Sequence, residues 1–98
     1  MFARVNVFQG PVDEFDKSLQ ITQEKALPVL RGTDGSVGII VLGDRSTGRS
    51  YVITLWRDEA ALKASDEMAN RVRTETTQAA GDEIVGVERH EVLLEERW

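Results

Sequence analysis

Few side chains in this sequence combine a reactive type with a position that chemistry could use. Asn6 is an amide in the middle of a largely apolar segment, residues 2–9, and could orient a carbonyl or stabilise an oxyanion. Trp56 could wall an apolar cavity and donate its single N–H to a ligand. Both residues also have structural interpretations: Asn6 as an amide bonded to a neighbouring backbone group, and Trp56 as a core anchor.

Tyr51 and His90 are two further candidates for a ligand pocket. Tyr51 could donate a proton to a substrate oxygen, or pack across strands with its hydroxyl in water. His90 is the only histidine, and in a strand it would share a face with Glu88, so the pair could act as a general base. The structural alternative is a histidine on a sheet face or at a dimer contact.

Several kinds of site have no support in the sequence. There is no cysteine, and a single histidine without helical acid–histidine spacing predicts no metal site. Dinucleotide-binding, phosphate-binding and nucleophile-elbow glycine motifs are absent, and Gly43 to Gly48 lacks the lysine of a phosphate loop. We therefore expect no bound cofactor.

Composition narrows the class of protein. The formal charge is −5, from 17 acidic and 12 basic residues, and the basic residues are scattered, which argues against nucleic-acid binding. No window has the length and hydropathy of a membrane helix, and no leader-like segment follows Met1. These features predict a cytoplasmic protein with no membrane or nucleic-acid partner. The length favours a single domain over residues 1–98.

Periodicity places these candidates on a simple series of elements. Alternating or continuous apolar residues predict strands over 2–9, 36–43, 49–56 and 84–94, with a bulge or close approach at Gly86. Helical spacing predicts helices over 11–31, kinked or ended at Pro28, and over 58–80, capped by Asp58 and stopped by Gly81. The order β-α-β-β-α-β predicts an α+β, ferredoxin-like sandwich: a four-stranded antiparallel sheet with both helices on one face.

The other face of such a sheet would have no cover within the chain. The middle strands nevertheless carry aliphatic residues at both odd and even positions, as in the SVGIIVL run of residues 36–42. A second copy of the same sheet is the simplest cover. We therefore expect a homodimer formed through the sheet face.

Four segments together resemble one family. They are ARVNVFQG (3–10), LGDRSTGRSYVITLW (42–56), DEAALKASDEMANRVR (58–73) and VERHEVLLE (87–95). They are similar to antibiotic-biosynthesis-monooxygenase-like proteins of the dimeric α/β-barrel superfamily. The resemblance implies two sheets that close into a barrel across a dimer. It also implies a small-molecule cavity between sheet and helices in each subunit.

The resemblance also bears on individual residues. Asn6 stands where haem-degrading relatives have an asparagine, but the 58–80 helix contains neither their tryptophan nor their histidine. Trp56 matches the strand-ending tryptophan of cofactor-free, quinone-forming oxygenases. Val52 and Leu62 occupy the positions of the asparagine and tyrosine of those enzymes.

Two main functions follow as hypotheses. The first is a small dimeric protein that binds a hydrophobic molecule near Asn6 and Trp56 and oxidises an aromatic, quinol-like substrate as a cofactor-independent monooxygenase. The second is a non-catalytic ligand-binding, sensing or assembly protein of the same fold. A third class, RNA binding on the sheet, would need exposed aromatic and basic residues that the aliphatic strands and negative charge do not supply.

Overall fold

The computed structural model describes all 98 residues, and its elements follow the predicted order. The strands are β1 (Phe2–Gln9), β2 (Ser36–Asp44), β3 (Arg49–Trp56) and β4 (Glu83–Glu91). The first helical segment comprises η1 (Val12–Glu14), α1 (Phe15–Ile21), η2 (Thr22–Ala26) and α2 (Leu27–Arg31). The second comprises α3 (Glu59–Ala64) and α4 (Asp66–Ala80).

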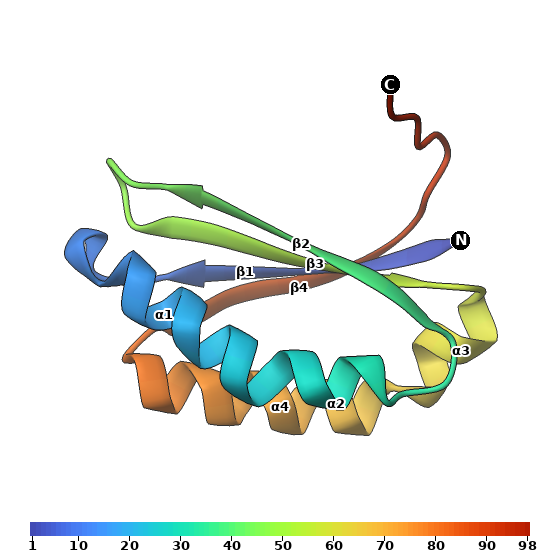
Figure 1. Cartoon of the computed structure of the whole chain (residues 1–98), viewed down its shortest axis with the longest axis horizontal. Coiled ribbons are helices and arrows are strands. Elements are labelled where there is room, and N and C mark those ends of the chain that lie inside the picture. The colour runs from blue at the N-terminus through green and yellow to red at the C-terminus, as the bar shows by residue number, and fades with distance from the viewer.

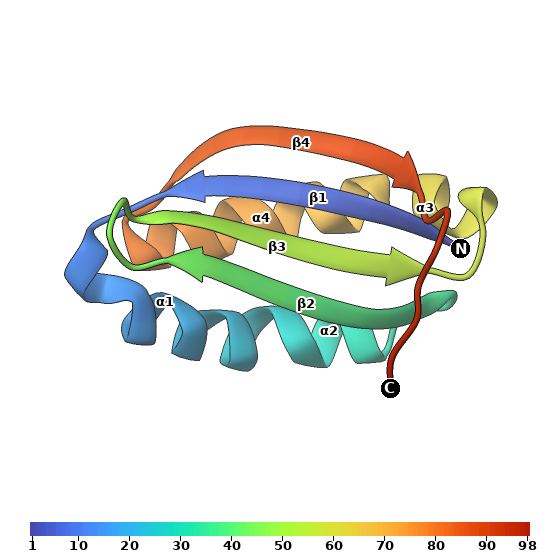
Figure 2. The same cartoon turned by 90° about the horizontal axis from the view of Figure 1, so that it is seen from above.

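The strands form one antiparallel sheet in the order β2-β3-β1-β4. Both helical segments cover the same face of this sheet (Figure 1), and Figure 2 shows the strands from the uncovered side. The predicted ferredoxin-like α+β fold is therefore confirmed. The pairing of β1 with β4 shifts register where Val7 faces Gly86 and Phe8 faces Ile84, which confirms the irregularity predicted at Gly86.

Pro28 does not end the first helical segment. A proline has no N–H to donate to the carbonyl four residues earlier, so a regular helix cannot pass through it unchanged. Here the chain widens into a π-helical turn, η2, just before the proline, and the Leu27 N–H donates to the carbonyl of Thr22. The helix then continues to Arg31, and Leu30 remains buried against the sheet.

The predicted 58–80 helix is two helices. Asp58 caps the first, because its Oδ1 accepts the Ala61 N–H at 2.8 Å. Ser65 then interrupts the series: its hydroxyl donates to the Leu62 carbonyl at 2.8 Å, a local bond that competes with helix continuation. The left-handed Gly81 (φ 76°) ends α4 as predicted. None of these helices combines the length and hydropathy needed to cross a membrane.

The best-packed part of the core lies where β3 passes into α3. Trp56 is fully buried there, and it packs with Leu30 and Leu62 and with the small residues Ala26 and Ala61. The two small residues allow the helices to approach the indole closely. This cluster anchors both helical segments to one end of the sheet.

The uncovered face, here called the open face, carries apolar side chains that no part of the chain covers. Tyr51 pairs with Val7 in register and lies on this face, as does Leu42, which is 49% exposed. Strand β4 ends at Glu91 rather than at the predicted residue 94. The Val92 N–H still bonds to the carbonyl of Met1. The tail with Leu93 and Leu94 leaves the sheet on the open side (Figure 1).

Candidate functional site

Two adjacent cavities lie between the helices and the sheet. The larger, here called the outer cavity, has a volume of about 250 Å³ and is bounded by α1, α4 and the hairpin end of β2 and β3. Its apolar walls include Phe8, Phe15, Leu19, Val41 and Val52. Such a cavity suits a compact apolar ligand.

The hairpin closes one side of the outer cavity. Arg45, in the β2–β3 turn, pairs with Asp16 of α1 at 3.2 Å, and its guanidinium carbon lies 5.7 Å from the centre of the Phe15 ring. Gly43 lets the Phe15 ring lie close to the backbone of β2, because a Cβ at residue 43 would lie 3.2 Å from that ring. Phe15 and Arg45 both line the outer cavity at this side.

Asp82 supplies the carboxylate of the outer cavity. Its Oδ2 accepts a hydrogen bond from the Ser18 hydroxyl at 3.3 Å. Burial raises the pKa of Asp82, and the Ser18 bond only partly opposes this. Gly10 makes room for the group, since any side chain at that position would overlap the carboxylate. The result is a carboxylate with increased proton affinity in a mostly apolar site.

The smaller cavity, here called the inner cavity, has a volume of about 60 Å³ and lies deeper along the covered face. Its polar groups include the side chains of Arg4, Asn6 and Arg73. Four residues line both cavities and show that the two are neighbours: Phe8, Thr22, Val52 and Thr76.

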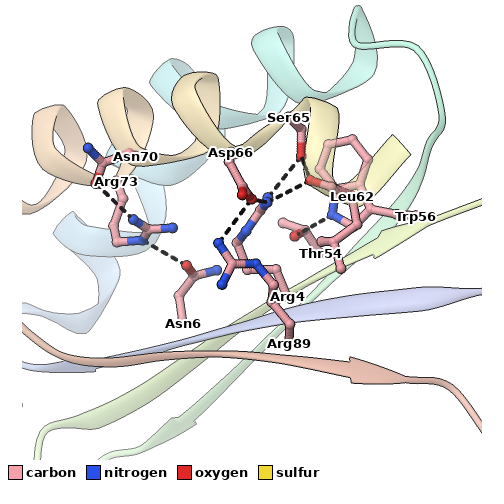
Figure 3. A network of polar contacts seen from close by, with 10 residues as sticks. All are labelled: Arg4, Asn6, Thr54, Trp56, Leu62, Ser65, Asp66, Asn70, Arg73 and Arg89. Carbon is pink, nitrogen blue, oxygen red and sulfur yellow. Dashed lines mark hydrogen bonds and ion pairs between the residues drawn. The ribbon is translucent and has the colours of Figure 1, made fainter. Parts of the chain in front are cut away.

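Asn6 is held at the wall of the inner cavity by bonds on both ends of its amide. The side chain is 6% exposed, its Nδ2 donates to the Val52 carbonyl at 2.8 Å, and its Oδ1 accepts from Arg73 Nε at 2.9 Å. Val52 faces Asn6 across the β1–β3 pair. The amide is therefore fixed with its oxygen toward α4 (Figure 3).

A cluster of three guanidinium groups lies beside the inner cavity with a single carboxylate, which two of them contact (Figure 3). Arg4 is 1% exposed and donates to Ser65 Oγ at 3.1 Å and to the Leu62 carbonyl at 2.9 Å. Its Nη2 also lies 2.5 Å from Asp66 Oδ1, and Arg89 of β4 reaches the same oxygen at 3.0 Å. The third guanidinium is that of Arg73.

Burial and the neighbouring charges shift the pKa values of these groups. Burial lowers the pKa of Arg4 and of Arg73, and for Arg73 the positive charges of Arg4 and Arg89 act in the same direction. Burial alone would raise the pKa of Asp66, but bonds from Arg89 and Arg4 outweigh it and hold that pKa below its ordinary value. Asp66 is thus a persistent anion.

The structure separates the four residues that the sequence proposed for a pocket. Asn6 lines the inner cavity, whereas Trp56 lines neither cavity, and its Nε1 donates to Thr54 Oγ1 at 2.9 Å. Tyr51 and His90 lie on the open face, where His90 Nε2 is 2.8 Å from Glu88 Oε1. The predicted pocket is therefore beside Asn6 but not beside Trp56, and the functional roles of all four remain predictions.

Sequence reasoning missed Arg4, Asp66, Arg73 and Asp82. Arg4 had a usable signal, because it shares the strand parity of Asn6 and Phe8 and must enter the covered face with them. Arg73 and Asp66 lie on α4 among exposed polar residues, and nothing in their spacing distinguishes them. Asp82 follows a helix-ending glycine, where an acidic residue is ordinary turn chemistry. The structure brings no three His, Cys, Asp or Glu side chains together as a metal site.

Known structures share this architecture over their whole length. A candidate antibiotic biosynthesis monooxygenase from Deinococcus radiodurans matches with a TM-score of 0.71 at 13% identity, covering 100% of this chain and 98% of that one. The chain has the antibiotic-biosynthesis-monooxygenase-type fold. A dimeric ferredoxin-like protein from an uncultured marine organism shares the fold with a TM-score of 0.72 at 11% identity, and each chain is covered completely.

Another protein with this monooxygenase-type fold is MhuD of Mycobacterium tuberculosis, a heme-degrader seen with two hemes in its active site. It matches with a TM-score of 0.67 at 19% identity, covering 99% of this chain and 100% of MhuD. No family model matches the sequence. The uncharacterized M. tuberculosis protein Rv2557 is 27% identical over 81 residues, which are 83% of this chain and 36% of Rv2557. The chain thus spans about a third of the length of the curated relatives it matches.

Proposed function

We propose that this protein binds a small, flat, mostly apolar molecule in the outer cavity. The observation that carries the proposal is the cavity itself, about 250 Å³ between α1, α4 and the sheet, with Phe8, Phe15 and Leu19 among its walls. Ligand sites are commonly about 300–1,000 Å³, so the volume suits a compact ligand of few rings. MhuD has the same fold and holds flat hemes in its active site, which supports a flat, mostly apolar ligand for this protein as well.

The more specific proposal is a cofactor-independent oxidation of a hydroxylated aromatic by dioxygen. Asp82 favours this function, because a carboxylate whose pKa is raised by burial can take the phenolic proton. The phenolate is then the electron-rich partner of dioxygen. One oxygen atom enters the ring as a carbonyl, the other leaves as water with two hydrogens from the substrate, and a phenol thereby becomes a quinone.

The alternative is ligand binding without turnover, as a carrier, sensor or assembly protein. The bonding of the predicted catalytic groups favours it: the Asn6 amide is engaged at both ends, and the Trp56 N–H is bonded to Thr54. Neither is a free donor waiting for an oxyanion. Binding is common to both functions, so the experiment must test binding first and oxidation second.

We further propose that the protein is a homodimer in which two open faces pack together. Leu42 and Tyr51 are exposed there, and Leu93 and Leu94 extend on the same side without a partner in the chain. A second copy would cover this apolar surface. That a ferredoxin-like protein of the same fold is dimeric supports a dimer.

A panel of naphthols, quinols and anthrones tests the proposal, with affinity measured by calorimetry and turnover by oxygen uptake. Ser50 lines the outer cavity from β3, and Ser50→Phe fills the space while Ser50→Ala leaves it open. We expect Ser50→Phe to weaken binding at least about tenfold and Ser50→Ala to change it little. Unchanged binding to Ser50→Phe would rule out the outer cavity, and binding without oxygen uptake would favour the non-catalytic function.

A further inference from the structure

Arg73 is a partly buried cation without an anionic partner. Its two hydrogen bonds go to amide oxygens, from Nε to Asn6 at 2.9 Å and from Nη1 to Asn70 at 3.2 Å. It forms no ion pair within the chain, unlike Arg4 and Arg89. Partly buried guanidinium groups usually bond to a carboxylate or phosphate, because amide oxygens do not neutralise the charge.

The charges around Arg73 do not compensate for this. Asp66 is the one carboxylate of the cluster, and a single oxygen of it already serves both Arg4 and Arg89. Three guanidinium groups against one carboxylate leave two uncompensated positive charges in a chain whose formal charge is −5. Burial lowers the pKa of Arg73, and the positive charges of Arg4 and Arg89 lower it further; those charges would attract an added anion at this point.

The inner cavity gives such an anion access to the cluster. Arg4, Asn6 and Arg73 line it, and the Nε of Arg4 is buried with no hydrogen-bond partner. A volume of about 60 Å³ exceeds the 10–15 Å³ that one water requires and can take a small polar group, but not a whole ligand. The rest of the ligand must therefore lie in the adjoining outer cavity.

We propose that the natural ligand is a flat apolar carboxylic acid whose carboxylate is bound by Arg73 beside Asn6. The apolar rings occupy the outer cavity, and the carboxylate reaches into the inner cavity beside Phe8 and Val52, which line both. The two oxygens of a carboxylate match the planar fork of a guanidinium. This inference rests on the proposed binding of flat molecules in the outer cavity.

Two probes of the same size test it: naphthoate, which is anionic at neutral pH, and naphthamide, which is neutral. Calorimetry in low salt should give the native protein at least about a tenfold preference for naphthoate, since hydrogen bonds to charged groups are strong. Arg73→Gln should remove the preference by weakening naphthoate and leaving naphthamide unchanged. Arg71→Gln is the matched control: Arg71 is an exposed arginine of α4, and its loss should keep the preference.

A second variant keeps the test decisive if Arg73→Gln disturbs the fold. Asn6→Asp loses the donor to the Val52 carbonyl, so its folding is checked by thermal unfolding; it retains an oxygen for Arg73 Nε and places a carboxylate beside it, so it should also remove the preference. Equal affinity of both probes for the native protein, or a preference that persists in both variants, would overturn the carboxylate inference alone. Binding of neither probe would overturn the proposed ligand function as well.

Discussion

Each face of the sheet departs in part from the usual division between an apolar covered side and a polar solvated side. The covered face buries polar side chains, among them Arg4, Asn6 and Thr54. The open face presents aliphatic side chains, including Val5 and Ile53 at its centre. In a half-covered antiparallel sheet, the covered side is normally apolar and the solvated side polar.

Each of these departures has its own explanation. On the covered face, the buried polar groups form hydrogen bonds to α4 and to the backbone. They therefore make up a hydrogen-bonded, charged cluster. On the open face, no helix covers Ile53 and its neighbours, which shield one another only in part. This difference between the faces is what the proposed ligand site and the proposed dimer interface would require.

The open face should give the largest effect on substitution. Ile53→Glu places a carboxylate between Val5 and Ile40, at the centre of the proposed dimer interface. Burying an unpaired carboxylate costs several kcal/mol, so we expect the dimer dissociation constant to rise at least about 100-fold. Sedimentation should give about twice the 10.9 kDa chain mass for the native protein and the single mass for the variant.

The control for this substitution is Val12→Glu, which makes the same chemical change on an exposed residue of η1. It should leave the dimer intact. A native protein that sediments as a monomer at micromolar concentration would contradict the proposed assembly, and the aliphatic open face would then need another explanation.

The fold was largely predictable because its signals are local. Alternation placed Arg4, Asn6 and Phe8 on one face of β1, and turn glycines separated the elements. The breaks at Ser65 and around Pro28 were harder to predict. Whether a serine hydroxyl interrupts a helix, or a π-turn absorbs a proline, depends on tertiary packing rather than on composition.

The site was much less predictable because its members are far apart in sequence. Arg73 meets Asn6 across 67 positions, and Arg4 meets Asp66 across 62. Only the crossing of α4 over β1 and β4 brings them together. Sequence reasoning instead favoured Trp56 for its type, but packing under the helices takes Trp56 away from both cavities.

On the covered face, Asp66→Asn should destabilise the protein by about 2 kcal/mol, because it removes the only carboxylate among three guanidinium groups and leaves the buried Arg4 uncompensated. Since the pKa of Asp66 is lowered in the folded state, its contribution is present above the ordinary aspartate pKa of about 3.9. That contribution is lost as the pH falls through the lowered folded pKa.

Urea unfolding at several pH values measures this effect. The difference between the native protein and Asp66→Asn should be full at pH 7 and shrink below about pH 4. Glu67→Gln, an exposed neighbour without an ion pair, is the control and should change stability by less than about 0.5 kcal/mol. An Asp66→Asn protein as stable as the native one at pH 7 would show that the charge cluster does not need its carboxylate.

At the other end of the covered face, Asp82→Asn should have the smallest effect and the opposite sign. Burial raises the pKa of Asp82, so its stabilising contribution exists below the ordinary value of about 3.9 and is lost as the pH rises through the raised folded pKa. The neutral amide should therefore stabilise the protein at pH 7, by less than about 1 kcal/mol because the group is partly solvated. The difference should disappear below about pH 4.

The same variant distinguishes a proton acceptor from a structural carboxylate. The amide of the Asp82→Asn protein would keep an oxygen for the Ser18 hydroxyl, so ligand binding in the outer cavity should persist while any oxygen uptake is lost. Glu83→Gln, an exposed neighbour, should alter neither stability nor turnover. If Asp82→Asn instead lowers stability at pH 7, the ionised carboxylate is favoured by the fold, and Asp82 is then a poor proton acceptor for a phenol. Retained oxygen uptake in a stable Asp82→Asn protein would place the base elsewhere, leaving the cavity as a binding site.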